Sequence, residues 1–143
     1  MLLNLTATGI YEFENSYLHL LLDEPARLMY STWLRNPSSA EYREATLRFI
    51  DYFQEKNIAY WISDTTNLTE ITKEDLEWVV KVLIPAANAS GLQKIARVSV
   101  VDTNIKALRE LVNFSSTKLV TTIEVEQFST YREAVSWIVG EPC

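Results

Sequence analysis

The chain has 143 residues, of which 48% are hydrophobic and 22% charged, and its formal net charge is −6. This length predicts one domain, 1–143, with one core. The acidic balance excludes a nucleic-acid partner, because binding phosphates requires clustered Lys and Arg side chains. The single cysteine, Cys143, excludes an internal disulfide and a cysteine-based metal site.

No part of the sequence has the features of a targeting or membrane segment. The N-terminal stretch lacks the basic start and the continuous apolar run of a signal peptide. Nowhere are there enough consecutive apolar residues to span a bilayer. With the low cysteine content, this leads us to expect a soluble, unprocessed, cytoplasmic protein.

The first third of the chain alternates between apolar and polar residues, which is typical of strands. Glu12–Glu14 and Tyr17–Asp23 are separated by the turn-forming pair Asn15-Ser16, so we expect a hairpin whose leucine face is buried. Arg27–Trp33 is rich in aromatic and β-branched residues and is predicted as a third strand. The chain therefore begins as an antiparallel meander.

Two capping boxes predict the starts of two helices. Ser38 and Glu41 begin the first, which is expected to run to about Asn57. Thr72 and Asp75 have the same spacing and begin the second. Each hydroxyl and carboxylate would satisfy backbone amides that have no partner in the first turn.

The second helix contains a proline, and the strand before it has helices on both sides in the sequence. Pro85 predicts a bend, or a stop at Ile84 followed by a second helical piece that ends at Gly91. Ala59–Asp64 is a short apolar strand, which we expect to be central and covered on both faces.

The remaining elements complete an α/β pattern. We expect strands at Ala96–Asp102 and Val120–Val125, a helix over Ile105–Asn113, and a last helix capped by Thr130 and Glu133. The predicted order is β-β-β-α-β-α-β-α-β-α. The fold class is α/β, with a mixed sheet, an antiparallel N-terminal hairpin or meander and about four flanking helices.

The segment Ala59–Val80 has the form of a strand, a loop and a helix, and such loops commonly carry binding groups. Asp64, Thr65, Thr66 and Thr72 are therefore the candidate residues for binding a ligand or a partner. As an alternative, Thr72 is explained as a helix N-cap, and Thr65 with Thr66 closes a turn. No basic cluster lies nearby in the sequence to receive a phosphate on these threonines.

Asp64 and Asp102 both end predicted strands, where they could hold Mg²⁺ between them. The alternative is that each aspartate caps its own loop through local hydrogen bonds. We expect no metal and no cofactor, and Asp64 with Asp102 remains the alternative metal pair.

The sequence shows no catalytic motif, so we expect a protein that is not an enzyme. His19 is the only histidine, and it lies within a strand without an evident nucleophile to activate. The three glycines cannot form a phosphate-binding loop. Most of the aromatic residues are expected in the core. Trp78 is offset from the apolar stripe of its helix, and Trp33 stands just before the Asn36-Pro37 turn, so these two are the candidates for an exposed aromatic patch.

Three stretches carry a resemblance to a known group: WISDTTNL, LIPAANASGLQKIARVSVVD and EQFSTYREAVSWI. With the opening strands, they resemble the SpoIIAA-like proteins of the STAS/CRAL-TRIO-related set, which are similar in fold to bacterial anti-sigma-factor antagonists. The resemblance implies a STAS-like mixed sheet and a non-enzymatic role. In the antagonists a serine after the central strand is phosphorylated by a partner kinase. Here Thr65 and Thr66 stand in that place, and the loop has no serine after Ser63 and no glycine.

We therefore expect a non-catalytic cytoplasmic domain that binds or regulates a protein partner. The alternatives are a protein that binds a small apolar ligand or lipid, and a Mg²⁺-dependent phosphoswitch or small enzyme that uses Asp64 and Asp102. A homodimer formed through the edge of the opening hairpin is a further expectation, because unpaired strand edges pair readily with another chain.

Overall fold

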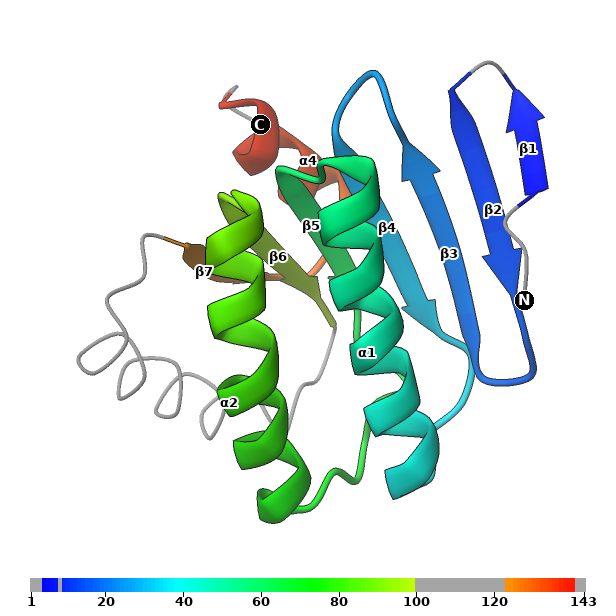
Figure 1. The fold of residues 1–143 in the computed structure, drawn as a ribbon, viewed down its shortest axis with the longest axis vertical. Coiled ribbons are helices and arrows are strands. Elements are labelled where there is room, and N and C mark those ends of the chain that lie inside the picture. Colours follow the sequence, from blue (N-terminus) through cyan, green and yellow to red (C-terminus); the bar gives the residue numbers. More distant parts are fainter. Residues whose placement is uncertain (1–3, 8, 100–122, 141–143) are drawn as a thin grey trace.

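The computed structural model describes residues 4–7, 9–99 and 123–140, which form a sheet with helices on both faces (Figure 1). The helix expected over Ile105–Asn113 lies outside these residues. In the described part of the chain there are three helices, compared with about four expected. The elements in chain order are β1 (Asn4–Ala7), β2 (Ile10–Glu14), β3 (Leu18–Asp23), β4 (Leu28–Trp33), α1 (Ser39–Lys56), β5 (Tyr60–Asp64), α2 (Lys73–Ser90), β6 (Lys94–Val98), β7 (Glu124–Phe128) and α4 (Tyr131–Val139).

The strands form one seven-stranded sheet whose spatial order is the order of the chain, from β1 to β7. Neighbours from β1 to β4 are antiparallel, and neighbours from β4 to β7 are parallel. The mixed sheet with an antiparallel N-terminal meander is therefore confirmed. β1 was not expected, and it pairs with β2 along the hairpin edge that we had assigned to a second copy of the chain. The sheet edge on that side is β1, and a homodimer formed there stays a prediction.

Helices α1 and α2 cover one face of the sheet, and α4 lies on the other (Figure 1). Connections between parallel strands are right-handed, and here they all advance in one direction, so α1 and α2 must lie on the same side. The expectation that β5 is covered on both faces is confirmed.

Aromatic side chains fill the centre of the core beneath α1 and α2. The Phe49 ring lies 4.8 Å from Trp61 and 6.2 Å from Trp33, measured between ring centroids. Phe53 contacts Trp61 edge-on at 5.5 Å. Such pairs add about 0.5–1.5 kcal/mol each beyond the area that they bury. The indole Nε1 of Trp61 donates a hydrogen bond to Ser31 Oγ, at 2.9 Å.

A smaller core lies between the sheet and α4. Ala134 and Ile138 of α4 pack on Ile62, Ala96 and Val98, which alternate with the residues of the main core along β5 and β6. α4 begins at the expected cap, because Thr130 Oγ1 accepts from the amide of Glu133 at 3.2 Å.

The capping box at the start of α1 is confirmed. Ser38 Oγ accepts from the amide of Glu41 at 3.1 Å, and Glu41 Oε1 accepts from the amide of Ser38 at 2.9 Å. Arg35 also donates two hydrogen bonds to the Glu41 carboxylate, at 2.8 and 2.9 Å. The bonds from Arg35 and then from Ser38 lower the pKa of Glu41 to about 2.

Only one of the two hydrogen bonds expected of the capping box at the start of α2 is present. Thr72 Oγ1 accepts from the amide of Asp75 at 3.1 Å, but the Asp75 carboxylate turns towards α1 and accepts from Ser39 Oγ and Arg43 Nε, both at 2.9 Å. Asp75 therefore ties the two helices together. α2 ends before Gly91, as expected, and Gly91 has the left-handed φ of 92°.

The expected stop at Ile84 is wrong, because α2 is continuous over Lys73–Ser90, and the alternative of a bend at Pro85 stays a prediction. Pro85 is exposed, whereas Ile84 and Ala87 are buried against the sheet. The carbonyl that loses its donor belongs to Lys81, one turn earlier on the same solvent-facing side, where water can replace the missing bond. Packing on the buried side then keeps the helix continuous.

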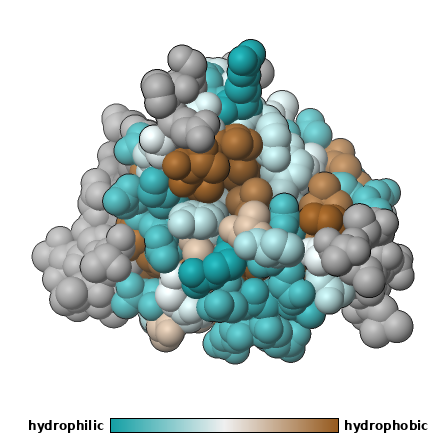
Figure 2. Space-filling model, turned by 90° about the horizontal axis from the view of Figure 1, so that it is seen from above, coloured by the Kyte–Doolittle hydropathy of each residue, from teal (hydrophilic) through white to brown (hydrophobic). Residues whose placement is uncertain are grey.

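Large apolar side chains are mostly covered. Figure 2 shows a largely hydrophilic surface with a hydrophobic patch near its centre and smaller hydrophobic areas towards its sides. Among the described residues, the exposed large apolar side chains are Leu34, Leu47, Tyr131 and Val139, and isolated exposure of this kind is ordinary. None of the described helices has the length and apolarity needed to cross a membrane.

We predict that Asp75→Asn lowers the free energy of unfolding by about 2 kcal/mol at pH 7, because it weakens two bonds to a buried charged group. Burial alone would raise the pKa of Asp75, but the bonds from Arg43 and Ser39 outweigh it and the pKa is lowered. The stabilisation is therefore present above about pH 4 and is lost as the pH falls further. Urea denaturation at pH 7 and pH 3 measures both effects.

The matched control is Glu74→Gln, which removes an exposed carboxylate from the same helical turn and should change stability by less than about 0.5 kcal/mol. An equal loss in both variants, or a loss in Asp75→Asn that does not shrink at low pH, would contradict the role of Asp75.

Candidate binding cavity beneath the Asp64 loop

A row of polar side chains crosses the inner face of the sheet, where an apolar core is expected. Ser31 pairs in register with Ser63, Ser63 with Arg97, and Arg97 with Gln127, on β4, β5, β6 and β7. Ser31, Ser63 and Arg97 are at most 5% exposed. Residues in register share a face of the sheet, so these four side chains all face α1 and α2.

The members of this polar row differ in how their hydrogen-bonding groups are satisfied. Ser31 accepts the bond from Trp61, and Gln127 Nε2 donates to the carbonyls of Ser99 and Phe128, each at 3.3 Å. Ser63 is 5% exposed and lines the cavity described below, and its hydroxyl forms no hydrogen bond with a described residue. Gln127 Oε1 is likewise buried without a hydrogen-bond partner among those residues. Buried polar groups without partners are rare in folded proteins and call for an explanation.

A cavity of about 70 Å³ lies against this row, between the sheet and the two helices. Thr46, Ser63, Thr65 and Arg97 form its polar side. A concave apolar site with a few convergent polar groups is the usual form of a small-ligand pocket. Its apolar wall includes Trp33, Phe49, Trp61, Leu68, Leu83 and Ile95.

The loop after β5 closes one end of the cavity, and only part of the predicted set of binding residues faces it. Thr65 is buried, lines the cavity, and donates its amide to the Val98 carbonyl at 2.8 Å. Thr66 is exposed, and Thr72 is occupied as the N-cap of α2. The sequence interpretation of Thr72 as a cap is confirmed, and Thr65 lies too deep to be a surface contact.

Asp64 lies on the other side of the sheet, because it alternates with Ser63 along β5. Its Oδ1 accepts from the Thr66 amide at 3.0 Å, which is the local turn predicted as the alternative to metal binding. Burial raises the pKa of Tyr30, and the nearby charge of Asp64 raises it further. Asp102, the other half of the alternative Mg²⁺ pair, lies outside the described residues.

The expectation that Trp33 is exposed is wrong. Trp33 is 3% exposed, stacks with Tyr17 at 6.4 Å and lines the cavity. Trp78 is half-buried, with the Arg43 guanidinium 4.8 Å from its ring centroid. The two tryptophans therefore do not form a common exposed patch.

Sequence reasoning missed the polar row, although part of the signal was present. Arg97 is a charged residue within the apolar run Ala96–Asp102, and Ser63 interrupts the run that ends at Asp64. Either residue alone fits an edge position or a turn. Only the register of four strands places them side by side and against one cavity.

The Asp64 loop, which runs from the end of β5 at Asp64 to Thr72 before α2, is held in place by two asparagines. Asn36 Oδ1 accepts from the amides of Thr69 and Glu70, at 2.9 and 3.0 Å, and Asn36 Nδ2 donates to the Glu70 carbonyl. Asn67 Nδ2 donates to the Trp33 carbonyl at 3.0 Å. The end of β4 and the residues after it therefore fix the loop that covers the cavity.

No protein-family model matches the chain, and neither the curated proteins nor the solved structures give a match. The resemblance to SpoIIAA-like proteins accordingly stays an expectation. The geometry of the cavity, the polar row and the loop is what remains to indicate function.

We predict that Asn36→Ala releases the Asp64 loop without unfolding the protein. The Thr69 and Glu70 amides lose their acceptor, worth about 1 kcal/mol each, so their protection from hydrogen exchange should fall about fivefold. The control Asn67→Ala removes the bond to Trp33 and leaves those two amides bonded. Exchange measured by NMR distinguishes the variants, and equal loss of protection in both would contradict the anchoring role of Asn36.

Proposed function

We propose that the chain is a non-catalytic binding domain, and that its cavity takes a small ligand with an apolar group and an acidic end. The observation that carries this proposal is the buried polar side of the cavity, formed by Ser63 and Arg97 opposite aromatic walls. A cavity that served packing alone would be lined by apolar side chains, because taking a charged or polar side chain out of water carries a desolvation cost.

The size of the cavity limits the ligand. An engineered cavity of roughly 150 Å³ holds one benzene molecule, so about 70 Å³ holds a group of about three heavy atoms. A short alkyl group fits this space against Phe49, Trp61 and Leu83. A full-length lipid chain does not, unless α1 and α2 separate from the sheet.

The charge of the polar row selects the other end of the ligand. Arg97 brings a permanent positive charge, and the Ser63 hydroxyl can donate or accept a hydrogen bond. Carboxylates match a guanidinium in geometry as well as in charge. A short-chain carboxylate therefore satisfies both walls at once.

A non-catalytic role agrees with where the only histidine lies. His19 is on the sheet face opposite the cavity, since it alternates with the inward-facing Leu18 and Leu20 of β3. The imidazole cannot reach Ser63 to act as its base.

The Asp64 loop connects the cavity with a surface that a protein partner could contact. Thr65 lines the cavity, and the next residue, Thr66, is exposed on the surface of the loop. A ligand bound in the cavity would thus change the conformation of the exposed part of the loop, beginning at the next residue. This is our version of the regulatory role that the resemblance to anti-sigma-factor antagonists implies, with ligand binding in place of phosphorylation.

We predict that acetate, which comes close to this size limit, binds in the cavity and shifts the amide resonances of Ser63, Thr65 and Arg97 in ¹H–¹⁵N NMR spectra. Ethanol, which carries a neutral hydroxyl group in place of the carboxylate, should bind more weakly, and ethylammonium should not bind. No shift at these amides with acetate would overturn the proposal. Binding of ethanol as tight as that of acetate would show an apolar site and would refute the acidic end of the proposed ligand.

We further predict that Ser63→Val abolishes the acetate shifts while raising the free energy of unfolding by about 1 kcal/mol. The two methyl groups fill part of the cavity, and the substitution removes a hydroxyl that has no hydrogen bond with a described residue. The control Thr32→Val also replaces a hydroxyl with a methyl group, but on the opposite face of the sheet, on β4. A loss of stability in Ser63→Val would show that the hydroxyl has a structural role instead.

A further inference from the structure

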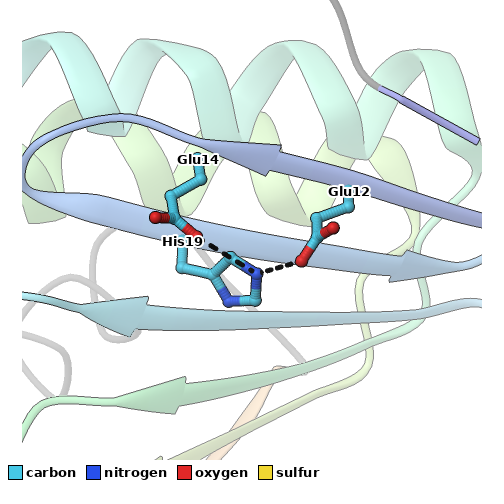
Figure 3. A group of neighbouring side chains, drawn as sticks. All are labelled: Glu12, Glu14 and His19. Carbon is cyan, nitrogen blue, oxygen red and sulfur yellow. Dashed lines mark hydrogen bonds and ion pairs between the residues drawn. The ribbon is translucent and has the colours of Figure 1, made fainter. Parts of the chain in front are cut away.

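Three side chains with metal-ligating atoms converge on the hairpin of β2 and β3. Glu12 and Glu14 come from β2, and His19 comes from β3 (Figure 3). One oxygen of each carboxylate and one ring nitrogen of His19 all lie within 4.8 Å of one another. In Figure 3 the helices lie behind the sheet and these side chains in front of it, on the face opposite the cavity.

The register of the hairpin produces this convergence. Glu12 and Glu14 are two residues apart on one strand and so share a face. His19 pairs directly with Glu14 across the strands, which places Glu12 on the diagonal. The backbone ladder therefore presents the three groups on neighbouring positions of one rigid surface.

The single imidazole ring pairs with the two carboxylates unequally. His19 Nε2 lies 2.6 Å from Glu12 Oε2, within hydrogen-bond distance, and 3.9 Å from Glu14 Oε1, where the contact is a long ion pair only. Among the described residues, neither glutamate forms an ion pair with a Lys or Arg side chain. The two like charges face one imidazole on a surface where a dication would neutralise both.

We propose that Glu12, Glu14 and His19 bind one first-row divalent cation of the Zn²⁺ type. Carboxylate oxygens and imidazole nitrogens are both ligands of Zn²⁺, and in a site with three protein ligands a water molecule completes the tetrahedron. Two ligands of such a tetrahedron are about 3.4 Å apart, at about 2.1 Å from the metal. Side-chain rotation of Glu14, whose side chain is 62% exposed, can close the remaining gap.

The nitrogen ligand selects the class of metal. Mg²⁺ and Ca²⁺ take six or more oxygen ligands, whereas imidazole suits Zn²⁺ and its first-row neighbours. Binding replaces the Nε2–H bond to Glu12 with a bond from Nε2 to the metal. The ring must therefore give up its Nε2 proton to solvent and keep the proton on Nδ1.

The first test uses the fact that His19 is the only histidine in the chain. Titration of the whole protein with ZnCl₂, followed through the imidazole ¹⁵N and ¹H resonances, should show one site and a large shift of Nε2. MgCl₂ at the same concentrations should leave the ring resonances in place. Unmoved ring resonances with Zn²⁺ would overturn the proposal.

Variants then separate this site from other metal ligands in the chain. Glu12→Gln, Glu14→Gln and His19→Gln should each weaken Zn²⁺ binding at least about tenfold in calorimetry, by analogy with the loss that even outer-shell changes cause. Glu124→Gln, an exposed glutamate on β7, should not change it, and neither should Cys143→Ser, which removes the only thiol. Unchanged binding in Glu12→Gln and His19→Gln would overturn the proposal.

A second readout does not depend on the ring resonances. Zn²⁺ joins β2 to β3 only in the folded chain, so it should raise the melting temperature of the native protein, and Glu14→Gln should reduce this rise. Glu14 is largely exposed, so this variant should fold as the native chain does. The proposed Zn²⁺ site and the cavity lie on opposite faces of the sheet. A failure to bind Zn²⁺ would therefore not contradict the proposed carboxylate ligand, and a failure to bind a carboxylate would not contradict the Zn²⁺ site.

Discussion

The other features of the structure depend on one constraint, the agreement between strand order in the sheet and strand order in the chain. Because β4, β5 and β6 follow one another in space, the two right-handed connections through α1 and α2 advance in the same direction, and these two helices share one face. The large aromatic core forms there. The nine-residue α4 is left to cover part of the other face. The two faces of the sheet can therefore carry different chemistry, with a buried polar row on one side and the hairpin carboxylates on the other.

The inner face of the sheet has to pack against two helices and also carries polar side chains, and these two properties oppose each other. Ser31 and Ser63 are in register, yet Ser31 is satisfied by the Trp61 indole, whereas Ser63 has no such partner among the described residues. The Ser63 hydroxyl lines the cavity, so the two serines of one register pair differ in what they contact. Proteins retain polar groups at such positions at a cost in stability.

Local signals explain what could be predicted from the sequence. The cap at Ser38, the turn at Asn15 and the end of α2 at Gly91 depend on neighbours within a few residues, and each is found as predicted. The errors concern packing over longer distances. The burial of Trp33 depends on α1, the continuity of α2 at Pro85 depends on the sheet beneath it, and the polar row needs the register of four strands. Of the candidate site, the sequence indicated the loop and missed the cavity wall.

The unequal size of the two cores has a consequence for how the fold opens. Among the described residues, the core under α1 and α2 includes more than twenty buried side chains, whereas the core between the sheet and α4 has five. Segments with few buried contacts open at lower free energy than the whole domain. Of the three described helices, α4 is therefore the one that we expect to detach at the lowest free energy. Its departure would uncover Ile62, Ala96 and Val98 on parallel strands, so α4 shields an apolar face of the sheet from contact with other chains.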